Sequence, residues 1–511
     1  MVEPISFSED YALVFQQRVR AFRENLDLES NSQARGEDRI SQLPDAVLRH
    51  ILSFIPSTKC VVRTSILSTR WKDVWACVPN LYLDDLEFSS SADFVAFVDR
   101  VLLVRDSSAI RKFRLHFNNG QAEDFSLVDA WIRTAVRCNV VELDLSVDSE
   151  GEEMFEWPES LLTCKTLMIW TLWLNHSIPI PTSGCCYPNL KVFHVIVSYP
   201  TAMNPDNDSM DFSHYPVLEH LTIDGSPGLD AFNFNISVPE LKTLRISLAP
   251  DFDLIDACNF LINAPKLEKL DINEGFLSNY TFVNTKSLVE VNIGVITVDD
   301  DENDASANRA TKFLAGISGV QCLTFSSPFS TACTLPVFDN LSKLMLVRDG
   351  DWWKILMKFL ERTPNLESFE IKHETCRPRQ RTEEEEVVIE LTECRNPDYV
   401  EVLYWSPPES VPKCLLSSLK SITIKGFQGK GFFGYLDEME LIKYLLKNCL
   451  VLEKMTIYTP GLCWGTKDEF YNEISESEWG SKSVQVHMIE KEFYWGDGCC
   501  SLRAKRIFSD I

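Results

Sequence analysis

The sequence predicts an α/β protein in which a short unit of three helices precedes a long stack of strand-bearing repeats. Apolar residues at helical spacing are dense between residues 37 and 80, and an apolar pattern of a different kind recurs from about residue 107 onward. The chain has 511 residues, of which 45% are hydrophobic and 24% charged, so it can supply a buried core. A chain of this length is expected to contain several domains.

The charge and the cysteine content restrict the class of partner and the compartment. A net charge of −26 repels nucleic-acid phosphates and anionic lipids, so neither nucleic acid nor a membrane is expected as a partner. The first residues do not resemble a signal peptide, and no apolar run is long enough for a membrane span. We therefore interpret the 16 cysteines as reduced thiols and expect residence in the nucleus, the cytoplasm or both.

Residues 37–80 predict three short helices. The first begins at Leu43-Pro44-Asp45, since proline is tolerated where a helix starts. Its apolar residues fall at steps of three and four and form one broad stripe: Val47, Leu48, Ile51, Leu52 and Ile55. Two further helices are marked by residues 60–67 and by a segment that Ser68 can cap and that carries Trp71 and Trp75. Three such helices bury little surface by themselves, which favours a partner surface.

The repeat after residue 107 has the form apolar-x-x-apolar-x-apolar and is often preceded by proline. Clear copies span residues 188–195, 216–223, 239–246, 265–272 and 364–371, and weaker ones begin at Ile110, Val140, Cys164, Leu288, Val320, Leu341, Leu419 and Leu452. The spacing of about 21–33 residues is typical of leucine-rich repeats. In each copy the last two apolar residues flank one variable residue, as in a short strand with one buried face, and stacking buries the apolar face of each copy. The alternative is an ordinary α/β domain with half-buried strands.

Two segments resemble known modules. Leu43-Pro44-Asp45, Ile51-Leu52, Leu67-Ser68, Arg70-Trp71 and Pro79-Asn80-Leu81 give residues 37–85 the pattern of an F-box. Trp405-Ser406-Pro407-Pro408, Ser418-Leu419-Lys420, Glu438-Met439-Glu440 and Val451-Leu452-Glu453 give the region 401–460 the pattern of an FBD module. With the repeats between them, the chain resembles the plant F-box/FBD/LRR-repeat proteins.

This resemblance implies a domain order and a function. A lead (1–36) precedes the F-box (37–85), a leucine-rich-repeat solenoid or horseshoe (107–400) contains an acidic insertion at about 373–400, and the FBD module (401–460) precedes a C-terminal cap or tail (461–511). The family implies a substrate-recognition adaptor of a Skp–cullin–F-box (SCF) ubiquitin ligase. The F-box would dock on a Skp-family adaptor and, through it, on the cullin–RING ligase, while the repeats and FBD module hold a target protein. The lead and the tail inherit nothing from the resemblance.

The adaptor contacts are expected on the F-box helices. The residues concerned are Leu43, Pro44, Leu48, Ile51, Leu52 and Trp71, with Ile55 and Leu67 partly in the core. The alternative is that all of them pack only on one another.

The sequence predicts no catalytic residue, no cofactor and no metal site. Residues 429–434 have the form G-x-G-x-x-G between a strand (421–425) and a helix (437–448), but the carboxylates of Asp437, Glu438 and Glu440 at the start of that helix would repel a pyrophosphate. The pairs Cys185-Cys186 and Cys499-Cys500 lack the spacing of a zinc site. Ligase chemistry would then belong to other subunits, and the alternative to the adaptor role is a non-proteolytic interaction scaffold, with an enzyme as a third class.

Target binding is expected on the variable residues of the repeat strands, which face away from the core. They are Arg114, Asp144, Met168, His194, Thr222, Arg245, Asp271, Asn292, Thr324, Met345, Glu370, Thr423 and Thr456. Of these, Arg245, Asp271, Met345 and Glu370 are the predicted target-binding residues, because arginine is favoured at binding hot spots and methionine adapts to irregular partners. The alternative is that each is merely solvated.

Overall fold

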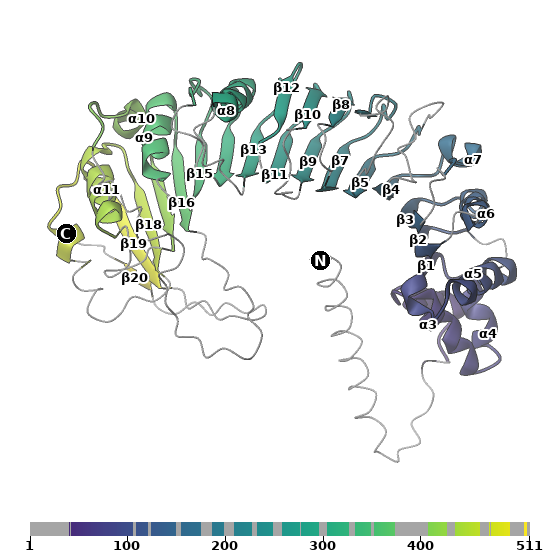
Figure 1. Cartoon of the computed structure of the whole chain (residues 1–511). Coiled ribbons are helices and arrows are strands. Elements are labelled where there is room, and N and C mark those ends of the chain that lie inside the picture. Colours follow the sequence, from purple (N-terminus) through teal and green to yellow (C-terminus); the bar gives the residue numbers. More distant parts are fainter. Residues whose placement is uncertain are drawn as a thin grey trace, which may run out of the picture. The chain divides into compact units, whose positions relative to one another are not determined.

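The computed structural model describes residues 40, 42–105, 109–120, 124–149, 155–174, 187–198, 209–226, 232–248, 258–275, 277–295, 304–326, 333–348, 352–373, 407–426, 435–459, 470, 472–490 and 505–507. The chain divides into two compact units, one formed by Met1–Pro56 with Cys60–Val78 and the other by Ser57–Lys59 with Pro79–Ile511 (Figure 1). The predicted lead at residues 1–36, the glycine-rich loop at 429–434 and both cysteine pairs lie outside the described residues. So does the acidic insertion apart from its first residue.

The first unit consists of short helices, as the apolar spacing predicts. Its elements are α2 (Asp45–Leu52), α3 (Thr58–Arg63), α4 (Trp71–Val74) and the 3₁₀ helices η2 (Thr64–Ile66) and η3 (Trp75–Cys77). Pro44 occupies the N-cap position of α2, and the helix ends at Leu52, so Ile55 of the predicted stripe lies beyond it. The guanidinium group of Arg70 donates hydrogen bonds to the Leu43 carbonyl and, over 2.9 Å, to Asp45 Oδ1, which fixes the start of α2 against the start of α4.

The second unit is built on one long sheet. In the described part of the chain this sheet has 16 strands: β1 (Asn80–Asp84), β2 (Lys112–Gly120), β3 (Glu142–Ser149), β4 (Ile169–Leu174), β5 (Val192–Ser198), β7 (His220–Ser226), β9 (Thr243–Leu248), β11 (Lys269–Glu274), β13 (Glu290–Val295), β14 (Cys322–Ser326), β15 (Lys343–Arg348), β16 (Ser368–His373), β17 (Ser421–Lys425), β18 (Lys454–Thr459), β19 (Gln485–Glu490) and β20 (Lys505–Ile507). Neighbours are parallel from β1 to β19, and β20 is antiparallel to β19. This is the stack of parallel strands that a leucine-rich-repeat solenoid requires.

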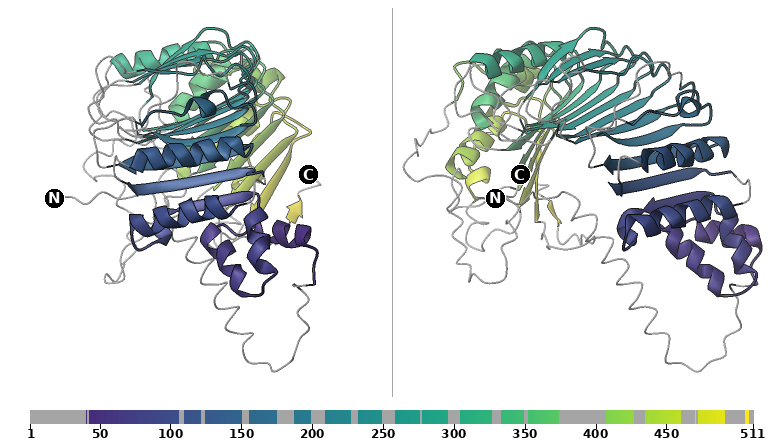
Figure 2. Two further views of the ribbon diagram at one scale, coloured as in Figure 1. Left: turned by 90° about the vertical axis from the view of Figure 1, so that its right-hand side faces the viewer. Right: turned by 45° about the vertical axis from the view of Figure 1, so that its right-hand side comes forward.

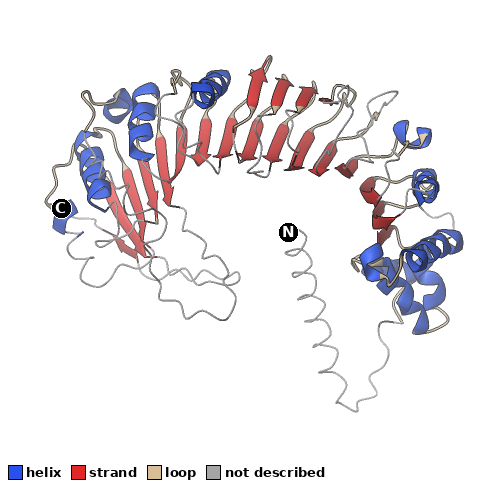
Figure 3. Ribbon diagram, viewed as in Figure 1, coloured by secondary structure: helices blue, strands red, loops and turns tan. Residues whose placement is uncertain are grey.

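A second layer covers one face of this sheet. It contains the helices α5 (Ser91–Val104), α6 (Phe125–Arg137), α7 (Glu159–Leu162), α8 (Asp304–Gly316), α9 (Trp352–Arg362), α10 (Lys413–Ser417) and α11 (Tyr435–Asn448), and the small sheet β6 (Ser209–Asp211), β8 (Asn233–Ser237), β10 (Asn259–Asn263) and β12 (Asn279–Phe282). Figures 2 and 3 show that, on this face, helices cover the first and last strands and the small sheet covers the middle strands. None of these described elements lies on the opposite face, which we call the outward face.

The core lies between the two layers. In β9, Leu244 and Ile246 are fully buried and point into it, while Arg245 between them is exposed. The same alternation repeats along the sheet, because successive residues of a strand point to opposite faces. Apart from the phrase beginning at Cys164, the predicted repeat phrases therefore correspond to strands whose last two apolar residues are core.

The small sheet was not predicted from the sequence. Phe234, Phe260 and Tyr280 are register partners on neighbouring strands, and their rings stack with centroids 4.5 and 4.9 Å apart. The signal was present, since an aromatic or aliphatic residue alternates with a polar one at residues 232–236. The repeat pattern itself predicts only strands of the larger sheet.

The larger sheet extends beyond the predicted repeats at both ends. It begins at Asn80, whereas the repeats were predicted from residue 107 and Asn80 had been counted with the F-box. At the other end, β19 and β20 come from the predicted tail, so that segment supplies strands of the same sheet. Among the described residues, no helix is both long and apolar enough to span a membrane.

A buried carboxyl group joins the end of β11 to the small sheet. Glu274 is 1% exposed, and its carboxylate accepts hydrogen bonds from the Tyr280 hydroxyl over 2.8 Å and from the Ser278 N–H over 2.9 Å. Burial raises the pKa of Glu274 to about 7 against these hydrogen bonds. The folded protein therefore keeps this proton at pH values at which the unfolded chain has lost it.

This proton makes stability depend on pH. We expect the contribution of Glu274 to be fully present below the ordinary pKa of 4.5 and to be lost as the pH rises through about 7. The free energy of unfolding should fall by about 3 kcal/mol over this window. In Glu274→Gln that fall should disappear, whereas Glu453→Gln, at an exposed carboxylate, should keep it. Denaturant unfolding at several pH values measures the difference, and equal slopes in wild type and Glu274→Gln would contradict it.

Candidate protein-binding surfaces

The first unit exposes an apolar stripe along α2 and the turn that follows. Val47, Ile51 and Phe54 are 41%, 43% and 72% exposed; the spacing of four residues places Val47 and Ile51 on one side of α2, and Phe54 follows in the turn. Ile66 and Leu67, at the end of η2, are 85% and 63% exposed. Large apolar side chains at such exposure are typical of a protein-binding surface.

The predicted adaptor-contact residues divide between the core and the surface. Leu48, Leu52 and Trp71 are buried inside the unit, and Leu43 and Ile55 are half-buried, so these five side chains hold the helices together or support the surface. Pro44, Ile51 and Leu67 are exposed. Leu67 is thus not partly in the core as expected, because η2 ends directly before it and turns its side chain to solvent. Sequence reasoning did not select Phe54 and Ile66.

The outward face carries the column of variable residues that the repeats predict, with one correction. Met168 lies just before β4, and the strand places Thr171 opposite Asp144 and His194 instead. The repeat phrase beginning at Cys164 was therefore read three residues too early. The column also continues to Tyr82 on β1 and His487 on β19, which were not predicted.

The four predicted target-binding residues form two neighbouring pairs. Arg245 on β9 lies directly opposite Asp271 on β11, and Met345 on β15 lies directly opposite Glu370 on β16. The strands β13 and β14 separate the two pairs. All four side chains face outward, and the role of each in target binding stays a prediction.

Charges on the first strands of the outward face are matched across the sheet. Arg114 Nε lies 2.6 Å from Asp144 Oδ2, and His116 Nε2 lies 3.4 Å from Asp144 Oδ1. Burial favours the protonated form of Asp144, but the hydrogen bond from His116 and the charge of Arg114 outweigh it and lower the pKa. Because each of these side chains is paired with an opposite charge, this part of the outward face presents little net charge to a partner.

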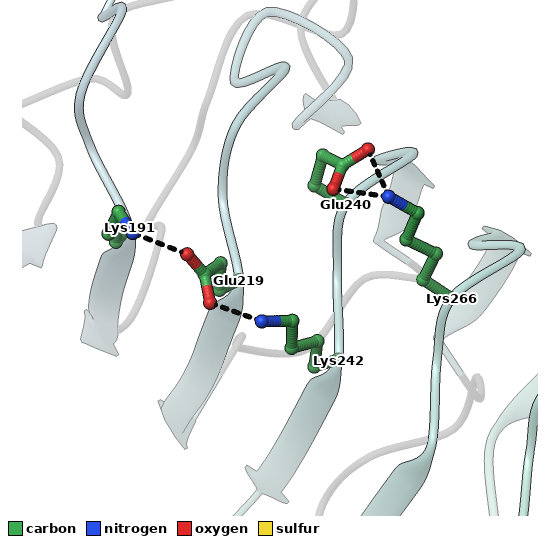
Figure 4. A network of polar contacts seen from close by, with 5 residues as sticks. All are labelled: Lys191, Glu219, Glu240, Lys242 and Lys266. Atoms are coloured by element: carbon green, nitrogen blue, oxygen red, sulfur yellow. Dashed lines mark hydrogen bonds and ion pairs between the residues drawn. The ribbon is translucent and has the colours of Figure 1, made fainter.

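A chain of ion pairs also links successive repeats just before their strands begin. Glu219 bridges Lys191 at 2.7 Å and Lys242 at 2.6 Å, and Lys266 contacts Glu240 at 2.6 Å in the neighbouring turns (Figure 4). Hydrogen bonds from Lys191 and Lys242 lower the pKa of Glu219 to about 2. These contacts connect repeat to repeat and are structural.

An apolar patch interrupts the polar outward face at β4. Ile169 and Trp173 are 36% and 38% exposed, and Ile196 on β5 is the register partner of Trp173. The His116 ring contacts Trp173 edge-on with centroids 6.5 Å apart. An exposed tryptophan surrounded by polar groups has the form of a binding hot spot.

The described residues show no arrangement typical of a metal site or of an activated thiol. No cluster of three metal-ligating side chains occurs among them. Burial raises the pKa of the Cys258 and Cys414 thiols to about 11, the opposite of what a nucleophilic cysteine requires.

Comparison with known proteins identifies the modules and the family. Residues 40–82 match the F-box domain, and residues 407–457 match the FBD family; the second match covers α10, β17, α11 and most of β18. F-box/LRR-repeat protein 13 from Arabidopsis thaliana is 30% identical over 456 residues, which cover 84% of this chain and 92% of that protein. An F-box/FBD/LRR-repeat protein from the same plant is 31% identical over 435 residues, which cover 83% and 87%. With an F-box at its start, parallel leucine-rich-repeat strands through its length and an FBD module near its end, the chain belongs to the F-box/FBD/LRR-repeat family.

Proposed function

We propose that the protein is the substrate-recognition subunit of an SCF-type ubiquitin ligase. The F-box implies binding to a Skp-type adaptor, and the observation that carries the proposal is the set of exposed apolar side chains in this unit: Val47, Ile51, Phe54, Ile66 and Leu67. More than two fifths of each residue is exposed in its own unit, and burial against a partner would remove that apolar surface from water.

The repeat sheet would hold the target. Its outward face offers the apolar patch around Trp173 at one end and charged side chains further along, so one target can be held by an apolar anchor and by polar contacts. The protein would thereby raise the local concentration of its target near the ligase. It would hold the target in place and would supply no reactive group. We propose no catalytic residue, cofactor or metal, no membrane or nucleic-acid partner, and residence in the nucleus, the cytoplasm or both.

Co-purification with a recombinant Skp-family adaptor tests the docking step. Wild type should elute with the adaptor as one complex. Leu43→Ala together with Pro44→Ala should weaken the complex about 30-fold, because these residues begin α2 beside the exposed stripe. Equal retention of the adaptor by wild type and variant would contradict the proposed site.

A further inference from the structure

The lysines of the outward face fall into two groups that differ in their neighbours. On the early and middle strands, register partners have opposite charge and pair: Lys112 contacts Glu142 at 2.7 Å, and Lys269 contacts Glu290 at 2.9 Å. A cation matched in this way stabilises the sheet by a few tenths of a kcal/mol to about 1 kcal/mol and presents little net charge.

The strands β15 to β18 lack this matching. The register partners of Lys343 are Cys322 and Ser368, and those of Lys454 are Ser421 and Gln485. Lys343, Lys372 and Lys454 are exposed, and none of the three side chains has an ion pair with another described residue.

One of these lysines also lies beside a fourth lysine of the outward face. Lys372 on β16 and Lys425 on β17 are direct register partners, an arrangement of like charges that destabilises a sheet. Glu370 forms an ion pair with Lys425 and leaves Lys372 unmatched. The fold does not require this repulsion between neighbouring lysines, which indicates that their charges serve to bind a partner.

The sign of this region is opposite to that of the whole chain. The outward positions of β15 to β18 hold four lysines and a single acidic side chain, Glu370, in a protein of net charge −26. At the adjoining strand edge, Glu367 contacts Lys420 at 3.5 Å, so that acid is paired as well. Long-range repulsion from the rest of the chain would favour a ligand whose negative charge is concentrated in a short segment.

We propose that the outward face of β15 to β18 binds an acidic segment of the target protein, with Lys343, Lys372 and Lys454 contacting its carboxylates. The inference rests on the proposed function, because it names the chemistry of the target that the repeat sheet would hold. Tyr458, the register partner of Lys425, supplies an aromatic neighbour at the edge of the basic surface.

Fluorescence anisotropy with short labelled peptides tests the inference. The probes are an alternating Glu-Ser peptide, its Gln-Ser and Lys-Ser counterparts, and a single-stranded oligonucleotide of similar length. We expect the Glu-Ser peptide alone to bind the full-length protein, with an affinity that falls as salt is added. The variant Lys343→Glu, Lys372→Glu, Lys454→Glu should bind it at least about tenfold more weakly.

A matched control separates the surface from net charge. Lys165→Glu, Lys286→Glu, Lys413→Glu changes the charge equally at exposed positions that lie off these outward strand positions, and it should keep binding. If the glutamate variant does not fold, the corresponding glutamine variant replaces it, with a melting curve as the check. Absence of Glu-Ser binding, equal loss in the control, or preference for the oligonucleotide would overturn the inference. Adaptor co-purification from the same samples tests the proposed function separately, since the F-box is unchanged.

Discussion

Replacing Ile51 and Phe54 together by aspartate is expected to weaken binding of a recombinant Skp-family adaptor by about 1000-fold with little change in the melting temperature. Phe54 is largely exposed and Ile51 is about half exposed in the first unit, so the change removes little of its packing. In a complex each would be a central apolar anchor, worth about 2 kcal/mol or more, and the new carboxylates would be buried without partners. Calorimetric titration of the purified proteins measures the loss.

Two other variants show whether the effect belongs to this surface. Leu103→Asp with Val283→Asp places the same charges at exposed apolar positions of the second unit and should leave adaptor affinity unchanged. Leu48→Ala, in the core of the first unit, should instead lower stability by about 2–5 kcal/mol. Adaptor binding by Ile51→Asp with Phe54→Asp that matches the wild type would exclude this stripe as the docking site.

Replacing Gly225 by alanine is expected to lower the free energy of unfolding of the second unit by about 3 kcal/mol or more. Gly225 lies in β7 with φ of +115°, and an added Cβ would lie 2.0 Å from the carbonyl oxygen of Val197 on the neighbouring strand β5. The obstacle is backbone that is itself bonded into the sheet, so it cannot move aside as a flexible side chain would. Denaturant unfolding measures the loss.

Gly319 provides the matched comparison for this substitution. A Cβ at Gly319 would meet nothing within 4 Å, so Gly319→Ala should change stability little. Equal stability of both variants would mean that the approach of β7 to β5 relaxes without cost.

The repeat strands were predictable because each copy carries its own local signal. The phrase around Arg245 alternates apolar and variable residues, and the structure places Leu244 and Ile246 in the core as expected. Met168 was misassigned because the phrase beginning at Cys164 offers several apolar residues in succession, and only pairing with β5 selects Thr171. Register between strands is a tertiary property that a single phrase does not encode.

The division of the F-box residues into core and surface could not be predicted from spacing. A stripe on α2 shows that one side is apolar, but Leu48 and Ile51 both belong to it, and packing of α4 against the helix decides which becomes core. The unmatched charge of Lys372 could not be predicted either, because the sequence separates Lys372 from Lys425 by an insertion and only the sheet makes the two lysines neighbours.

The fate of captured proteins tests the central claim most directly. Proteins captured by proximity labelling with both the wild type and the variant Ile51→Asp, Phe54→Asp would be followed for ubiquitination and half-life in cells that express one or the other. We expect them to carry ubiquitin chains and turn over quickly with the wild type, and to accumulate unmodified with the variant, which still holds them but no longer reaches the ligase. Equal ubiquitination and equal half-life in both cells would contradict the proposed role and indicate a scaffold that binds without causing degradation.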